Sequence, residues 1–142
     1  GYACGPQTLI EAMMRVHQYS MLCASSIAQA AALEAMRHGQ RARDEMRLEY
    51  EQRRNVIVRR LNDMGLTCFK PRGAFYAFPC IRSSGLNSRD FAQRLLQQQK
   101  VALVPGTAFG ACGEGFVRCS YATAMDDIEE AMVRTKAFLE SL

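Results

Sequence analysis

The apolar residues of this 142-residue chain change their spacing at Gly65. Before this glycine they recur at helical intervals from about Arg41 to Met64, with charged residues on the opposite side, which predicts one long amphipathic helix. After it, short apolar runs are separated by turn residues, which is typical of short strands. The pattern therefore predicts an α+β fold, in which helices cover one face of a small sheet within residues 65–142.

The segment after Gly65 alternates candidate strands with candidate helices. The expected strands span residues 66–69, 74–78, 101–104 and 116–121, and the expected helices begin at Asn87 or Ser88 and after Thr123. A glycine-rich loop at 105–115 connects two of these strands. Thr123, with Asp126 three residues later, resembles a capping box at the start of the last helix.

Two further helices are expected before the long one. Pro6 is tolerated in the first turn of a helix. A second, alanine-rich helix begins at Ser25 or Ser26, and Gly39 offers its stop. These two helices have no sheet of their own, so their apolar faces need a partner that the sequence does not supply. We therefore expect the chain to be a piece of a larger protein.

The composition argues against several classes of function. The formal net charge is only +4 and the basic residues are dispersed, so nothing indicates nucleic-acid binding. No apolar run approaches the roughly 20 residues that span a membrane. Six cysteines without a C-x-x-C pair, and only two histidines, argue against a metal site or a disulfide framework. We expect buried free thiols and hence a cytoplasmic protein.

Arg118 is the residue that says most about function. It lies in the strand predicted for residues 116–121, where alternation places Phe116, Arg118 and Ser120 on one face. A guanidinium half-buried on a strand is costly unless an anion pairs with it, and a carboxylate bound through both oxygens is its natural partner. That partner is either an Asp or Glu of the protein, which is the commoner arrangement, or the carboxylate of a ligand.

The other candidate positions have simpler structural explanations. The glycines around Phe109 let a ligand approach the backbone, but the loop lacks the spacings of phosphate-binding motifs. Phe75 and Phe78 are expected to pack in the core. A solvated helix face is expected for the arginines of the long helix, which are Arg47, Arg53, Arg54, Arg59 and Arg60.

Five segments carry a resemblance to a known family. In chain order they read GYACGP at 1–6, SSIAQAA at 25–31, KPRGAFY at 70–76, VPGTAFG at 104–110 and FVRCSYA at 116–122. Together, in this order and at these spacings, they resemble the class I and class II aminotransferases of fold type I. The resemblance covers essentially the whole chain.

The resemblance implies a pyridoxal 5'-phosphate cofactor and a division into three parts. Residues 1–40 correspond to terminal helices of the large cofactor-binding domain, residues 41–64 to a long connecting helix, and residues 65–142 to the C-terminal small domain. The family's arginine at the position of Arg118 clamps the α-carboxylate of the substrate. Phe109 is expected to line the substrate pocket.

The resemblance also implies a residue that this chain lacks. The family needs a Schiff-base lysine, and none of Lys70, Lys100 and Lys136 stands in the matching motif. That lysine is therefore expected upstream of Gly1. The chain would then contain no catalytic, cofactor-binding or metal-binding residue, and would be inactive alone.

By this resemblance, the full-length protein moves an amino group between an amino acid and a 2-oxo acid, as a homodimer whose 21–26 segment reaches the neighbouring subunit. The stretch Tyr19–Leu22 has no second arginine for a side-chain carboxylate, which favours a neutral, aromatic or alanine-type substrate. Two alternatives stay open. One is a carbon–sulfur lyase or decarboxylase on the same scaffold, and the other is a non-catalytic effector-binding module of a regulator.

Overall fold

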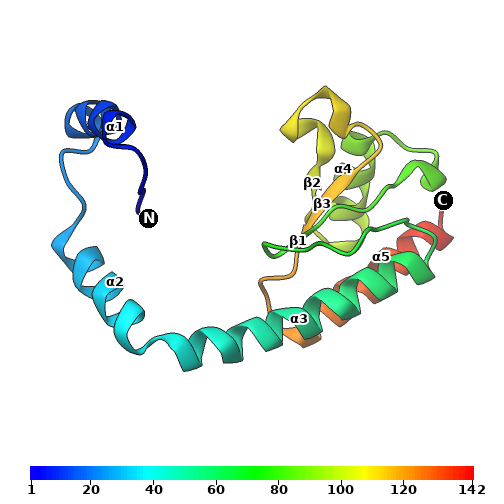
Figure 1. Cartoon of the computed structure of the whole chain (residues 1–142). Coiled ribbons are helices and arrows are strands. Elements are labelled where there is room, and N and C mark those ends of the chain that lie inside the picture. Colours follow the sequence, from blue (N-terminus) through cyan, green and yellow to red (C-terminus); the bar gives the residue numbers. More distant parts are fainter. The chain divides into compact units, whose positions relative to one another are not determined.

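The computed structural model describes all 142 residues, which divide into two compact units, Gly1–Asp44 and Glu45–Leu142 (Figure 1). Helices and a small antiparallel sheet make up the second unit, which confirms the predicted α+β fold. None of the helices combines the length and the apolar character that a membrane crossing requires.

The first unit consists of α1 (Gln7–Ser20), α2 (Ser26–His38) and the first residues of α3 (Gln40–Asp63). Gly39 ends α2, as predicted, but with a right-handed φ of −78°. Its carbonyl already accepts a hydrogen bond from the Arg43 N–H, so α3 begins without an intervening loop.

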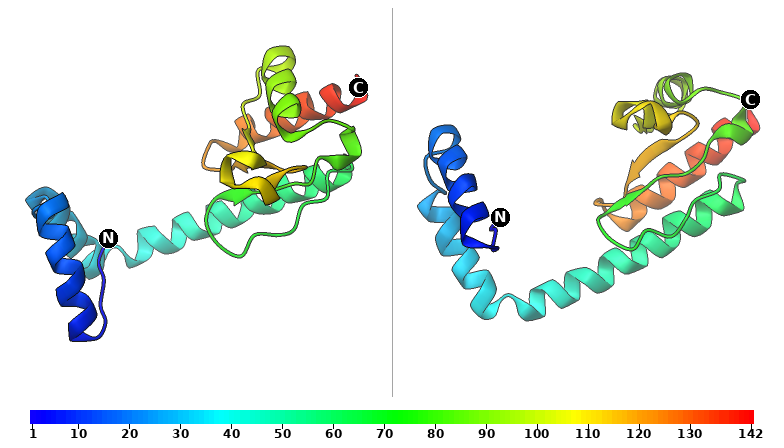
Figure 2. Two further views of the ribbon diagram at one scale, coloured as in Figure 1. Left: turned by 90° about the horizontal axis from the view of Figure 1, so that it is seen from above. Right: turned by 45° about the horizontal axis from the view of Figure 1, so that its top comes forward.

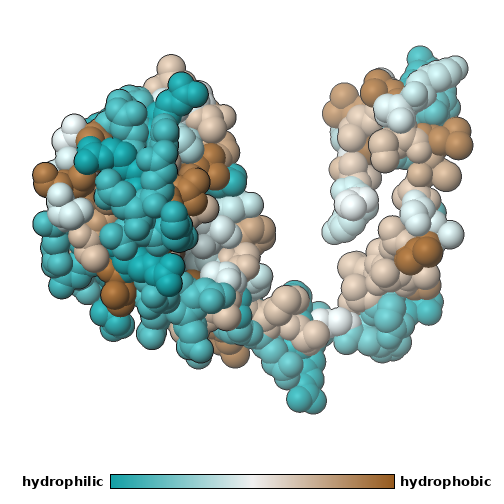
Figure 3. Space-filling model, turned by 180° about the vertical axis from the view of Figure 1, so that it is seen from behind, coloured by the Kyte–Doolittle hydropathy of each residue, from teal (hydrophilic) through white to brown (hydrophobic).

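The two helices α1 and α2 bury none of their side chains. Large apolar residues on them are exposed, among them Val16, Ile27 and Met36, and brown side chains are visible on the surface of both helices (Figure 3). Exposed apolar surface of this kind is typical of a face that another element covers.

The second unit begins within α3, which ends at Asp63. Gly65 follows it with a left-handed φ of +84°, a conformation that suits glycine. The later helices and strands are β1 (Tyr76–Ala77), α4 (Ser88–Gln99), β2 (Val104–Pro105), β3 (Val117–Ser120) and α5 (Met125–Glu140). Three short 3₁₀ helices lie among them: η1 (Arg82–Ser84), η2 (Gly106–Phe109) and η3 (Ala111–Gly113).

The sheet has the order β1-β3-β2, and both pairs of strands are antiparallel. Tyr76 of β1 lies opposite Ser120, and Val104 of β2 lies opposite Arg118. The central strand is therefore the one that carries Arg118.

One face of the sheet packs against α3, α4 and α5 in a single buried cluster, and α3 and α5 run alongside each other (Figures 1 and 2). The sheet contributes Ala77, Val117 and Cys119. The helices contribute Ile57 and Leu61 from α3, Phe91 and Leu95 from α4, and Ile128, Met132 and Phe138 from α5. Burying a large apolar side chain contributes about 1.5–3 kcal/mol, so this cluster is the main source of stability in the second unit.

The strand predicted at residues 66–69 is wrong. This stretch forms no strand, because its backbone bonds elsewhere. The Asn62 side chain accepts from Cys68 N (3.1 Å) and donates to Cys68 O (3.0 Å). The carbonyl of Thr67 accepts from Cys80 N at 2.8 Å. One asparagine at the end of α3 thus takes the place of a strand partner.

Of the helix caps predicted at Asn87 and Thr123, the structure confirms the first and contradicts the second. Asn87 caps α4 as predicted, since its side chain accepts from Asp90 N at 2.9 Å. The capping box at Thr123 is wrong. Ala124 is the residue that precedes α5, and the Thr123 hydroxyl instead donates to Asp127 Oδ2 at 2.9 Å.

The cysteines are only partly buried, contrary to expectation. Cys68 and Cys119 are buried, and burial together with the neighbouring Cys68 raises the pKa of Cys119 to about 12. Cys4, Cys23 and Cys112 are exposed, so the expectation of buried thiols is wrong for these three.

Candidate functional site

The two faces of β3 differ in character, as the alternation predicted. Val117 and Cys119 are buried against the helices. Arg118 is half-buried on the opposite face, and Ser120 on that face is exposed. The strand therefore holds a guanidinium group on the side of the sheet opposite α3, α4 and α5.

Arg118 is held by aromatic rings rather than by an acidic residue. Its guanidinium carbon lies 4.3 Å from the ring centroid of Tyr76 and 4.7 Å from that of Phe109. Its side chain forms no ion pair or hydrogen bond with any residue of the chain. A pair with an Asp or Glu of the protein was one of the two expectations, and residues 1–142 contain no such pair.

Arg118 and its two rings belong to a longer aromatic strip, which we define as Phe75, Tyr76, Phe78, Phe109 and Phe116. The centroids of Phe75 and Tyr76 lie 4.6 Å apart, and that of Phe78 lies 5.9 Å from Phe109 and 5.8 Å from Phe116. Arg118 joins the two groups. Arg82 stacks on Phe116 at the far end, 5.1 Å from its centroid. The expectation that Phe75 and Phe78 pack in the core is wrong, because they are 39% and 37% exposed.

The loop that carries Phe109 has little freedom. A Cβ at either Gly106 or Gly113 would collide with the carbonyl of the other, so both positions require glycine. Gly106 N also donates to Phe116 O at 2.8 Å. The loop is therefore folded tightly on itself, and Phe109 at its tip is held against Arg118.

Glu114 fastens this loop to the start of α4. One of its carboxylate oxygens, Oε1, accepts from Ser88 N (2.9 Å), Ser88 Oγ (3.1 Å) and Gly115 N (2.9 Å). The bond from Ser88 N makes the largest contribution to lowering the pKa of Glu114, with further contributions from the Gly115 N–H, the Ser88 hydroxyl and the charge of Arg82. A carboxylate at a helix N-terminus is also favoured by the helix dipole.

Chemically, this arrangement is suited to binding a planar anion. A guanidinium stacked between two rings keeps a fixed plane and presents its N–H groups at its edge. With no carboxylate of the chain on that edge, a ligand carboxylate can bind through two parallel hydrogen bonds.

The lysines lie outside this arrangement. Lys100 Nζ donates to Gln97 O of its own helix at 2.9 Å, and Lys136 pairs with Glu140 at 3.7 Å. Lys70 is exposed in the loop before Pro71. These residues do not form a site for pyridoxal 5'-phosphate, which needs a lysine for its aldehyde group. No group of three or more His, Cys, Asp or Glu side chains is placed to hold a metal ion.

The sequence matches the family model described as aminotransferase class I and II, over residues 1–134. The chain belongs to this family. The resemblance first drawn from five short segments is thereby confirmed across nearly the whole chain.

Individual aminotransferases and their relatives agree with this assignment. YugH of Bacillus subtilis strain 168 is 51% identical over 139 residues, and an aspartate aminotransferase of Pyrococcus abyssi is 46% identical over 141 residues, each covering 98% of this chain. The crystal structure of an aromatic aminotransferase from Pyrococcus horikoshii OT3 superposes with a TM-score of 0.91 at 45% identity, over 97% of this chain. The chain spans 36% of the length of both sequence relatives and 37% of the solved chain.

The structure brings the two predicted site residues, Arg118 and Phe109, into direct contact. Sequence reasoning gave no site role to Tyr76, Ser88 or Glu114. For Tyr76 a signal was present, since alternation from a strand pairing antiparallel with 116–121 puts it on the face of Arg118. No comparable signal marked Glu114, because its partner lies 26 residues away in the sequence.

Proposed function

We propose that this chain forms the substrate-carboxylate part of an aminotransferase that moves an amino group between an amino acid and a 2-oxo acid. Arg118 binds the α-carboxylate of the substrate, and Phe109 lines the pocket beside it. The observation that supports this is the guanidinium of Arg118, stacked between Tyr76 and Phe109 without an acidic partner in the chain. An arginine left in this state is suited to a ligand carboxylate.

The two rings give Arg118 a role beyond simple attraction. They fix the plane of the guanidinium, so that a bound carboxylate takes one orientation and the rest of the substrate is directed accordingly. They also keep water from the two faces of the group, which strengthens the hydrogen bonds made at its edge.

Pyridoxal 5'-phosphate is the cofactor of the full-length enzyme in this proposal, and its lysine lies in sequence outside these residues. Residues 1–40 belong to the large domain, residues 41–64 connect the domains, and residues 65–142 form the small domain. The enzyme is a cytoplasmic homodimer in which the 21–26 segment contributes to the neighbouring subunit.

The substrate class follows only in part from the family. Relatives of nearly equal identity are named for aspartate and for aromatic amino acids, so overall similarity does not choose between them. The exposed rings beside Arg118 and the lack of an arginine at residues 19–22 favour a neutral or aromatic side chain.

The test is to replace Arg118 in the full-length polypeptide. Arg118→Ala should lower kcat/KM for amino acids about 100-fold, because a charge-assisted pair is lost, and Arg118→Lys should recover only part of it. An unchanged kcat/KM would refute the role of Arg118. Product analysis separates the alternatives, since a 2-oxo acid with aminated cofactor indicates transamination, whereas ammonia with pyruvate indicates a lyase.

A further inference from the structure

A second cluster of arginines lines a cavity that does not include Arg118. The cavity has a volume of about 430 Å³ and lies between α3 and the loop of residues 71–75. Arg47, Arg54 and Arg72 are among its lining residues, and Glu51 is the one acidic side chain. Three positive charges and one negative charge leave the cavity with a net charge of +2.

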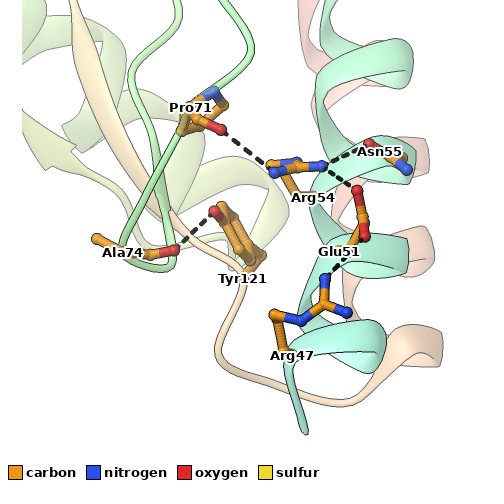
Figure 4. Close-up of polar contacts among 7 residues, drawn as sticks. All are labelled: Arg47, Glu51, Arg54, Asn55, Pro71, Ala74 and Tyr121. Carbon is orange, nitrogen blue, oxygen red and sulfur yellow. Dashed lines mark hydrogen bonds and ion pairs between the residues drawn. The ribbon is translucent and has the colours of Figure 1, made fainter. Parts of the chain in front are cut away.

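The wall on the side of α3 follows from helical spacing. Arg47, Glu51 and Arg54 are separated by four and then three residues, which places them on one face of α3. Arg54 donates to Glu51 Oε1 at 2.8 Å and reaches across to the Pro71 carbonyl at 3.5 Å (Figure 4). The expectation of a solvated face is wrong for Arg53 and Arg54, whose side chains are each only 17% exposed.

The opposite wall is a loop held in one conformation. The Tyr121 hydroxyl donates to Ala74 O at 3.0 Å (Figure 4). Tyr121 N donates to Phe75 O at 2.9 Å. Ala74 has a left-handed φ of 59°, which is strained for a residue with a Cβ. The loop is thus anchored from α3 through Arg54 and from the end of β3 through Tyr121, and the cavity is preformed.

The hydrogen-bond donors in this cavity outnumber their acceptors. The two oxygens of Glu51 are already taken, one by Arg54 at 2.8 Å and the other by Arg47 at 3.6 Å. Arg54 Nε is buried and has no partner, and Arg72 makes no hydrogen bond or ion pair with the chain. The guanidinium of Arg72, which is exposed and without a partner in the chain, is therefore available to a bound anion.

We propose that this cavity binds the phosphate group of a small molecule. A phosphate monoester carries a charge near −2 at neutral pH, which matches the net charge of the cavity. Its several oxygens can accept from arginines on two opposite walls at once, whereas a single carboxylate suits one guanidinium edge. Tyr50 and Phe75, stacked at 6.1 Å on the cavity lining, offer an apolar surface to the organic part of the ligand. The site is separate from Arg118 and does not depend on the proposed function.

The test is a titration of the 142-residue chain with inorganic phosphate at pH 7.5 in about 150 mM salt, where nonspecific surface attraction is largely screened. We expect saturable binding, observed by calorimetry and as shifts of the arginine Nε–Hε signals of Arg47, Arg54 and Arg72. Arg72→Ala should weaken binding about tenfold, because it removes one charge-assisted bond without touching the bonds that anchor the loop.

Two matched variants serve as controls. Arg94→Ala removes an exposed arginine of α4 that has no partner, so it lowers the net charge equally and should change the affinity less than about twofold. Arg118→Ala should also leave phosphate binding unchanged, which keeps this site distinct from the carboxylate site. Equal weakening by Arg72→Ala and Arg94→Ala, or no saturable binding, would overturn the site. Succinate binding as tightly as phosphate would overturn the assignment to phosphate.

Discussion

Along β3, neighbouring residues enter two different environments. Val117 and Cys119 point into a core formed with α3, α4 and α5, whereas Arg118 points to a face on which aromatic rings stay partly exposed. The first face excludes water and is the main source of stability in the unit Glu45–Leu142. The second face holds an arginine without an acidic partner in the chain, an arrangement that is suited to ligand binding.

The largest loss of stability is expected from a substitution in the core that packs on the helix-covered face. Phe91 of α4 is fully buried and meets Phe138 of α5 edge to face, with the ring centroids 5.4 Å apart. Phe91→Ala removes this contact and leaves a cavity, so the free energy of unfolding should fall by about 3–5 kcal/mol in urea titrations. Phe69→Ala is the control, because Phe69 is 85% exposed and its loss should cost little.

A smaller loss of stability is expected from a substitution at Tyr121, which follows β3. Its ring is buried, but its hydroxyl leaves the core to bond Ala74 O at 3.0 Å. Tyr121→Phe keeps the ring and removes the bond, which should cost about 1–1.5 kcal/mol of unfolding free energy. Tyr19→Phe, at an exposed position, should cost nothing measurable. If Tyr121→Phe were equally neutral, the Ala74 carbonyl would not depend on this hydroxyl.

A pH-dependent contribution to stability is expected from Glu114, which fastens the Phe109 loop to α4. Its pKa is lowered in the folded state, chiefly by the bond from Ser88 N, so its ionised form stabilises the fold at neutral pH. This contribution is present above the ordinary carboxyl pKa and is lost as the pH falls through the lowered value. Glu114→Gln should therefore lower the melting temperature at pH 7, and the gap from the wild type should close on acidification.

The control for this effect is Glu129→Gln, which changes an exposed glutamate of α5. It should leave the pH dependence of the melting temperature as in the wild type. A gap between Glu114→Gln and the wild type that stays constant from pH 7 to about pH 3 would mean that the charge of Glu114 is not what stabilises the loop.

The helices and the two-faced character of β3 could be predicted from the sequence, because they depend on spacing along one segment. The apolar stripes of α3 and α4 and the alternation around Arg118 are local patterns of this kind. The missing strand at residues 66–69 shows the limit. Its apolar residues fit a strand, but a side chain of α3, Asn62, offers its backbone better-placed partners.

The candidate site could be predicted only in part, because its residues come from separate segments of the chain. The sequence identified Arg118 and left its partner open between an acidic residue and a ligand. It could not show that Tyr76 and Phe109 stack on the guanidinium, because these rings come from separate segments that only the folded sheet and its tight glycine loop bring together. The sequence likewise did not indicate the cavity: Arg54 was expected on a solvated face, and Arg72 lies in a loop that residues 64–70 separate from α3.

The last prediction compares two adjacent residues on opposite faces of β3, Val117 and Arg118. It includes the smallest expected loss of stability. Val117→Ala should cost about 1–2 kcal/mol of unfolding free energy, since Val117 is fully buried. Arg118→Ala should cost less than about 1 kcal/mol, because it removes only stacking on two partly exposed rings and no ion pair. Both are measured by urea unfolding of the same chain. A loss at Arg118 as large as that at Val117 would mean that the arginine holds the fold together, and its proposed part in binding substrate would lose its structural basis.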